Sequence, residues 1–210
     1  MNFIICAAVG LISLASTHAA IVSGLVSDFE DGTTQGWAGG ANPTNVASGG
    51  PDGADDNFLR VGNGGRLATH NTTLSGVIDS AATAIQVDLR RPIADADDID
   101  VRLVLLGPGT SNRWTSTALQ VVPEDSAWAT YTFSLLEADL SQVQGTASYA
   151  EMVADVNRVM FRYDPGTPSP GGSVIGGNLD IDNVRVIPEP QVALLALVSG
   201  VMIFARRRKR

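Results

Sequence analysis

Apolar and polar residues alternate along the middle of the chain, which is the pattern of β-strands with one buried face. Residues 85–90 (IQVDLR) alternate strictly, and residues 101–106 (VRLVLL) end at a Gly-Pro-Gly turn. Further β-rich runs between glycine, proline and aspartate residues cover 114–122, 128–135, 156–163 and 179–187. Only 148–155 has a helical pattern. These elements predict an all-β protein, an antiparallel β-sandwich or jelly roll with one short helix.

Two glycine-rich segments, 36–56 and 165–178, interrupt the strand pattern. Long loops on a sandwich are either binding loops or insertions that the fold tolerates, and both interpretations stay open here. The chain contains no internal repeat, and its length allows one domain of ordinary size together with terminal signals.

The N-terminus has the features of a secretory signal peptide. An apolar stretch over 3–14 is followed by Thr17-His18-Ala19, which offers small residues at the −3 and −1 positions of a cleavage site. We therefore expect a signal peptide over 1–19, export by the Sec machinery and an ectodomain over 20–187. Removal of the signal peptide removes Cys6, the only cysteine, so the ectodomain has no disulfide and no cysteine metal ligand.

The C-terminus combines three elements that a globular domain does not need. They are Pro188-Glu189-Pro190, an apolar run over 192–205, and the basic cluster Arg206, Arg207, Arg208, Lys209 and Arg210. The apolar run is shorter than the ~18–20 residues that cross a bilayer comfortably, although its flanks bring it closer. The basic cluster would stay cytoplasmic by the positive-inside rule, which predicts a transmembrane helix held transiently in the inner membrane.

This C-terminal order, over 188–210, resembles the PEP-CTERM sorting signal. The resemblance implies recognition by an exosortase in a Gram-negative bacterium that makes exopolysaccharide, with cleavage near the motif. The mature protein would then reach the outer surface or the extracellular matrix. A simple C-terminal membrane anchor is the alternative.

The net charge of the ectodomain is more negative than that of the whole chain. The chain carries −8, but residues 20–187 contain nine arginines, no lysine and 21 carboxylates, a net charge of −12. Such an acidic domain argues against nucleic acid and anionic membranes as partners, whereas it is compatible with divalent cations or neutral glycans.

Several short motifs along the ectodomain resemble jelly-roll domains of carbohydrate-binding modules and of the laminin B (domain IV) type. They are Phe29-Glu30, Gly32 and Trp37; Pro51, Gly53 and Phe58-Leu59; Trp128, Tyr131, Phe133 and Leu135; and Ile181-Asp182-Asn183-Val184. The resemblance implies a structural Ca²⁺ held by Glu30 and Asp182, with Asp28 or Asp52 as further ligands.

The chemistry of the residues is compatible with a calcium site. Asp182 shares the strand parity of the apolar Val184 and Val186, so we expect its carboxylate on the core-facing side of the last strand. A carboxylate buried alone is costly, whereas one that shares a cation is tolerable, and Ca²⁺ prefers oxygen ligands. The alternative is that these carboxylates cap turns or accept hydrogen bonds from backbone amides.

Aromatic side chains are the usual platform for sugar rings, and Trp37 and Trp114 are the candidates that fall outside a clear apolar alternation. The alternative is that all three tryptophans are buried, because large aromatic residues dominate cores.

Catalytic motifs are sparse. After removal of the signal peptide His70 is the only histidine, and no G-x-S-x-G nucleophile elbow occurs. We therefore predict a non-catalytic, exported, surface-sorted protein of the extracellular or biofilm matrix that binds glycan or exopolysaccharide through a calcium-stabilised jelly roll. The alternatives are a purely structural or adhesive matrix protein without a sugar site, and a polysaccharide hydrolase that uses an unmarked carboxylate pair.

Overall fold

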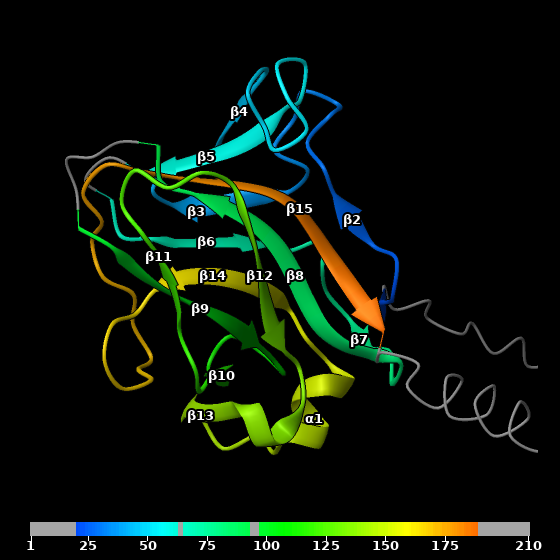
Figure 1. The fold of residues 1–210 in the computed structure, drawn as a ribbon. Helices are drawn as coiled ribbons and strands as arrows, with labels where there is room; N and C mark the ends of the chain where they lie inside the picture. The colour runs from blue at the N-terminus through cyan, green and yellow to red at the C-terminus, as the bar shows by residue number, and fades with distance from the viewer. Residues whose placement is uncertain (1–19, 63–64, 93–96, 189–210) are drawn as a thin grey trace, which may run out of the picture.

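The computed structural model of the chain describes residues 20–62, 65–92 and 97–188. In this part the chain folds into two packed antiparallel sheets and one short α-helix (Figure 1), which confirms the predicted β-sandwich. The expected signal peptide over 1–19 and the expected sorting signal from Glu189 onward lie outside the described residues. Within the described residues, no helix is both long enough and apolar enough to span a membrane.

The larger sheet has seven strands in the order β13–β10–β9–β14–β6–β3, with β11 also paired to β9. Their bounds are β3 (Trp37–Gly40), β6 (Ala68–Asn71), β9 (Ile99–Leu106), β10 (Arg113–Ser116), β11 (Gln120–Val122), β13 (Leu140–Gln144) and β14 (Arg158–Tyr163). The run predicted over 114–122 is thus interrupted at 117–119. The cause is local, because the Thr117 amide donates to Asp139 O instead of continuing the ladder with β9.

The smaller sheet has six strands in the order β12–β8–β15–β5–β4, with β2 also paired to β15. Their bounds are β2 (Val26–Ser27), β4 (Thr44–Val46), β5 (Phe58–Gly62), β8 (Ala82–Arg90), β12 (Ala129–Ser134) and β15 (Asn178–Pro188). The last strand therefore lies in the middle of this sheet, next to the early strand β2, where Val184 pairs with Ser27. Outside both sheets, β1 (Ala20–Ile21) pairs in parallel with β7 (Val77–Ile78).

Two short helical turns close one end of the sandwich (Figure 1). The α-helix α1 (Tyr149–Ala154) begins after Ser148, whose hydroxyl accepts from the Glu151 amide while the Glu151 carboxylate accepts from the Ser148 amide. This capping box satisfies amide groups that the first turn leaves unpaired. Met152 anchors the helix in the core, and the 3₁₀ turn η1 (Glu137–Asp139) leads into β13.

The core lies between the inner faces of the two sheets. Trp37 of β3 stacks on Phe161 of β14 with ring centroids 5.4 Å apart, and Phe133 of β12 approaches Phe161 from the opposite sheet at 5.6 Å. Aromatic contacts of this kind add to the free energy that burial of the rings already supplies. The two sheets are therefore joined at their centre by an aromatic cluster.

Candidate functional site

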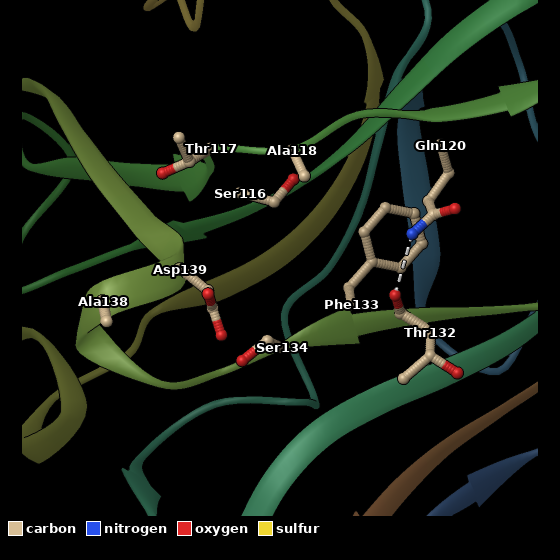
Figure 2. Close-up of a pocket in the computed structure, with 9 residues that line it drawn as sticks. All are labelled: Ser116, Thr117, Ala118, Gln120, Thr132, Phe133, Ser134, Ala138 and Asp139. Atoms are coloured by element: carbon tan, nitrogen blue, oxygen red, sulfur yellow. Dashed lines mark hydrogen bonds between the residues drawn. The ribbon is translucent and has the colours of Figure 1, made fainter.

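A pocket of about 280 Å³ opens at one edge of the sandwich, between the segment that joins β10 to β11, strand β12 and the 3₁₀ turn η1 (Figure 2). Its lining consists of hydroxyl, amide and carboxylate side chains with one aromatic ring and two alanines. The residues are Ser116, Thr117, Ala118, Gln120, Thr132, Phe133, Ser134, Ala138 and Asp139. The pocket exists because β12 is an edge strand and the chain leaves β9 between β10 and β11.

Hydrogen bonds hold most of these polar side chains in place. Gln120 Nε2 donates to Thr132 O over 3.0 Å, and Ser134 Oγ accepts from the Leu136 amide over 3.1 Å. The Thr117 and Ser141 hydroxyls lie 2.8 Å apart. Each hydroxyl keeps a donor or acceptor position for a further partner. The pocket is therefore preorganised, with hydrogen-bonding capacity that its own residues do not use.

Asp139 supplies the one carboxylate of the pocket. Its side chain is exposed and forms no hydrogen bond or ion pair with any described residue. Figure 2 shows the Asp139 carboxylate and the Ser134 hydroxyl on the same side of the opening. An ionised carboxylate accepts strong hydrogen bonds from hydroxyl groups. This pocket therefore suits a neutral ligand with several hydroxyl groups. Its lining contains one carboxylate, whereas glycoside hydrolysis uses a pair.

The sugar-stacking role expected for Trp37 and Trp114 requires correction. Trp37 is 2% exposed and stacks on Phe161 in the core, and its indole N–H points to Ser27 Oγ, 3.4 Å away. Trp114 is 9% exposed, because its ring packs on Tyr149 and its indole N–H donates to Ala147 O. Neither ring presents a face to a ligand, so burial, the alternative reading, describes both residues.

Trp128, which belongs to one of the jelly-roll motifs, is the tryptophan that lies closest to the surface. It is half-buried just before β12, and its ring packs edge-on against Phe58 while Arg90 lies 4.6 Å from its centroid. Its indole N–H donates to Gly49 O over 3.0 Å. The side chain thus fastens the glycine-rich loop before β5 to the outer face of the six-stranded sheet.

The four predicted calcium ligands are placed very differently. Asp182 is completely buried, whereas Glu30, Asp28 and Asp52 are exposed. Asp28 faces Gln35, whose Nε2 donates to Asp28 Oδ1 over 3.0 Å, and Glu30 Oε1 accepts from the Asn57 amide over 2.8 Å. Within the described residues, no three acidic or histidine side chains converge into a metal-binding cluster. The predicted ligands Glu30 and Asp182, with Asp28 or Asp52 in addition, therefore do not form a cluster of three carboxylates among the described residues.

The strand parity of Asp182 suggested the core-facing side of β15, but the structure places its side chain on the opposite side. A β-bulge between Asp182 and Arg185, with Asn183 at φ 48°, shifts the register, so that Asp182 pairs with Asp88 while Val184 stays in the core. An extra residue in a bulge inverts the alternation beyond it. Asp182 consequently sits on the outer face, covered by the N-terminal segments.

The surroundings of Asp182 are electrostatically unfavourable for its charge. Its Oδ1 accepts from the Asn183 amide, but its buried Oδ2 has no hydrogen-bond partner among the described residues. Burial raises the pKa of Asp182 to about 8, and the carboxylates of Asp56, Asp88 and Glu30 contribute to the rise. Asp56 and Asp88 were not recognised from the sequence, because only the pairing of distant strands and loops brings them to Asp182.

Comparisons with known proteins find similar structures but no similar sequence. No protein-family model matches the chain, and no curated protein matches it. The CBM22-1 xylan-binding domain from Paenibacillus barcinonensis superposes with a TM-score of 0.50 at 16% identity, over 79% of this chain and 95% of that domain. The Clostridium thermocellum module CtCBM11 superposes with a TM-score of 0.50 at 19% identity, over 85% of this chain and 100% of the module.

An exo-β-agarase superposes with a TM-score of 0.54 at 12% identity, over 80% of this chain but only 26% of that protein. At such low identities a structural likeness establishes the fold and nothing finer. The chain therefore has the β-sandwich fold that carbohydrate-binding modules of this jelly-roll type share.

Proposed function

We propose that this protein binds carbohydrate without catalysing a reaction, and that the pocket beside η1 accommodates a neutral sugar unit. The observation that carries the proposal is the preorganised set of hydroxyl, amide and carboxylate groups at the open edge of a fold shared with carbohydrate-binding modules. Sugar recognition needs a few well-placed polar groups that fix orientation in a concave site. A purely structural matrix protein would gain nothing from polar side chains arranged in this way.

The test is glycan binding by the full chain, measured by isothermal titration calorimetry against soluble polysaccharides, including xylan, agarose oligosaccharides and mixed-linked β-glucan. Asp139→Asn should weaken binding at least about 10-fold, because a hydrogen bond to an ionised acceptor contributes ~1.5–3 kcal/mol. Glu137→Gln is the matched control, since Glu137 lies in the same 3₁₀ turn but does not line the pocket. Absence of binding to every polysaccharide would favour the structural or adhesive alternative, whereas release of reducing sugar would favour a hydrolase.

We also propose that Ca²⁺ binds beside Asp182, with Glu30 as a second ligand and backbone or amide oxygens completing the coordination. The supporting observation is the buried Asp182 Oδ2 without a hydrogen-bond partner, next to further carboxylates. A divalent cation would supply the missing positive charge there and stabilise the pairing of β15 with the N-terminal segments. Asp56 is a better candidate for a further ligand than Asp28 or Asp52, because the Asp56 charge acts on Asp182 whereas Asp28 Oδ1 accepts from Gln35.

The proposed location follows from the two ends of the sequence. We infer export by the Sec machinery, a transient inner-membrane intermediate, processing by an exosortase and release to the outer surface or extracellular matrix. Cell fractionation of a producing bacterium tests this order. Replacement of Pro188-Glu189-Pro190 by Ala-Ala-Ala should leave the protein in the membrane fraction, whereas an unchanged extracellular yield would contradict the sorting role.

A further inference from the structure

The arginines of this acidic domain are concentrated on one face. Five of the nine lie on the outer face of the seven-stranded sheet or at its margin: Arg66, Arg102, Arg113, Arg158 and Arg162. Arg102 and Arg162 alternate with the core residues Leu103 and Phe161, and they pair across β9 and β14. The strands themselves contain one carboxylate, Asp100, and Asp164 follows β14, while Asp98, Glu124 and Asp139 lie at the strand ends. The centre of this face is therefore basic, although the domain is acidic.

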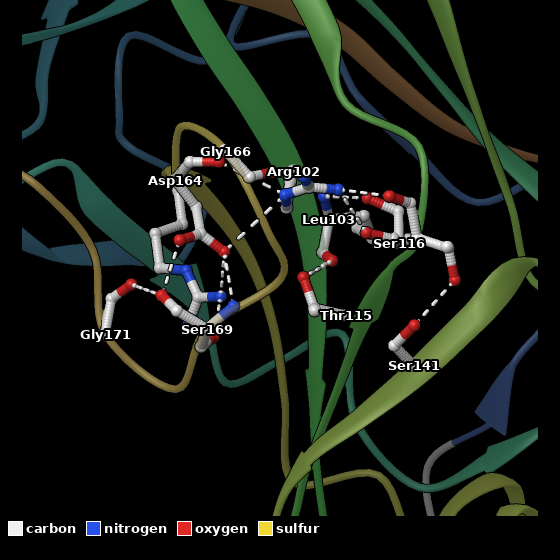
Figure 3. Close-up of polar contacts among 11 residues, drawn as sticks. Arg102, Leu103, Thr115, Ser116, Ser141, Asp164, Gly166, Ser169 and Gly171 are labelled. Atoms are coloured by element: carbon white, nitrogen blue, oxygen red, sulfur yellow. Dashed lines mark hydrogen bonds and ion pairs between the residues drawn. The ribbon is translucent and has the colours of Figure 1, made fainter.

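Two of these guanidinium groups are buried and share one carboxylate. Arg102 donates to four backbone carbonyls, those of Asp164, Ser116, Thr117 and Gly166 (Figure 3). Arg162 Nη2 lies 2.7 Å from Asp164 Oδ2, and Arg102 Nε lies 3.6 Å from the same oxygen. One negative charge beneath two positive charges leaves an excess of buried positive charge.

A third guanidinium reaches the same region from β10. Arg113 Nη1 donates to Pro170 O in the loop that covers Arg162. The buried Nε atoms of Arg113 and Arg162 have no hydrogen-bond partner in the described part of the chain. Burial lowers the pKa of Arg162, and the Arg113 and Arg102 cations lower it further against the opposing effect of Asp164. These three cations repel one another, and an added anion would relieve that repulsion.

Two further arginines are available at the surface of this face. Arg66 is exposed and Arg158 is half-buried, and neither guanidinium group forms a hydrogen bond or ion pair with a described residue. Arg158 lies near His70, whose pKa is lowered by burial and additionally by the Arg158 charge. His70 is therefore neutral at pH 7 and adds hydrogen-bonding capacity without adding charge.

We propose that the outer face of the seven-stranded sheet binds an acidic polysaccharide, whose carboxylates pair with Arg66, Arg113 and Arg158 above the buried Arg102–Arg162 pair. The inference rests on the proposed carbohydrate-binding function and names the class of glycan. It concerns the outer face of the sheet, which adjoins the pocket beside η1, since Arg102 donates to the backbone carbonyls of the pocket residues Ser116 and Thr117. Guanidinium groups pair with carboxylates in two-pronged hydrogen-bonded geometry, which gives the face selectivity for uronate groups over hydroxyl groups.

An acidic glycan suits this surface better than a nucleic acid does. The ectodomain carries 21 carboxylates and nine arginines, and Asp98, Glu124 and Asp139 already lie at the ends of the strands of this face. A densely charged polymer that extends beyond the basic face would be repelled by these carboxylates. A polysaccharide with one carboxylate per sugar has a lower charge density and neutral rings between the charges, so the basic face alone can bind it.

The experiment compares polygalacturonate with its fully methyl-esterified form, because the two share a backbone and differ in charge. Binding by the full chain is measured by affinity electrophoresis and calorimetry. We expect binding to polygalacturonate that weakens with added salt, and binding to the esterified polymer at least about 10-fold weaker. The double substitution Arg66→Gln/Arg158→Gln removes two charges that hold no described structural contact, and should weaken polygalacturonate binding about 10-fold or more.

Arg185→Gln is the control, because Arg185 lies on the other sheet beside Asp88. Equal binding of both polymers, or an equal loss in the control, would overturn the acidic-glycan inference while leaving the carbohydrate-binding function intact. Binding of neutral glycans alone would do the same. Tighter binding of single-stranded DNA than of polygalacturonate would also overturn it. Absence of binding to all polysaccharides would remove the proposed function, and the inference with it.

Discussion

Asp182 should make the stability of this protein depend on pH in the direction opposite to that of an ion-paired aspartate. The side chain is completely buried, one of its oxygens has no hydrogen-bond partner in the described residues, and its pKa in the folded state is about 8 instead of 3.8. The folded state therefore binds this proton more tightly than the unfolded state does. In the absence of a cation, the free energy of unfolding should fall as the pH rises from about 4 to 8.

The size of the effect follows from the difference of about four pKa units. One unit corresponds to about 1.4 kcal/mol, so relative to pH below 4 the free energy of unfolding should be about 4 kcal/mol lower at pH 7 and about 6 kcal/mol lower above pH 8. Relaxation of the structure around the charge makes these values upper bounds. They are still comparable with the 5–15 kcal/mol that stabilises a typical domain. Asp182→Asn removes the ionisation, so in EDTA it should stabilise the protein most at pH 8 and much less at pH 5.

Urea unfolding followed by tryptophan fluorescence, at pH 5 to 8 in EDTA and in millimolar Ca²⁺, tests both the pH dependence of stability and the binding of Ca²⁺. In EDTA the wild type should lose several kcal/mol over this range, and Asp182→Asn should lose much less. In Ca²⁺ the wild type should regain stability at pH 8, because an ion that binds only the folded state stabilises it by mass action. A flat pH profile of the wild type in EDTA would refute the account of Asp182. Identical wild-type curves in EDTA and Ca²⁺ would refute the calcium proposal.

Substitutions at three further positions test the packing. Trp37→Ala should destabilise the fold by about 3–5 kcal/mol in urea unfolding, because it removes the ring stacked on Phe161, and glycan affinity of the remaining folded protein should not change. Asn183→Val should cost about 1–2 kcal/mol, since a β-branched residue is strained at φ 48°, whereas Asn183→Gly should be nearly neutral in the same assay. Arg102→Met should cost about 3 kcal/mol or more by leaving carbonyl groups unpaired, and limited proteolysis should then cleave within 165–177 faster than in the wild type.

The strands that the sequence predicts best have one face in the core and are hydrogen-bonded to a neighbouring strand on each side. The alternation over 85–90 marks β8, and the runs over 101–106 and 179–187 mark β9 and β15. The helix predicted over 148–155 is α1, whose capping box is local and therefore visible in sequence. Strand β13 was missed, because a strand at the edge of a sheet buries few side chains and shows a weak pattern.

Long-range pairing decides the features that sequence reasoning placed wrongly. Trp37 is followed by Ala-Gly-Gly, so its own strand offers no alternation, and only the pairing with β6 shows that its ring faces the core. Parity placed Asp182 and Val184 on the same face of β15, but because of the bulge at Asn183 the two side chains lie on opposite faces. A single residue at positive φ thus reverses a prediction that rests on period two, since every side chain beyond it changes sides.

The net charge of −12 does not describe the surface that a ligand meets, and the reason is again the pairing of distant strands. A net charge far from zero describes the average field of a domain, whereas a ligand meets the charges of one face. The alternation of Arg102 with Leu103 and of Arg162 with Phe161 already places each arginine opposite the core in its own strand. That the two strands are neighbours follows only from the fold, because β9 and β14 are separated by four strands and a helix along the chain. Charges that are dispersed in an acidic sequence thereby become one basic surface, and the glycans that the protein is expected to bind extend from neutral to acidic ones.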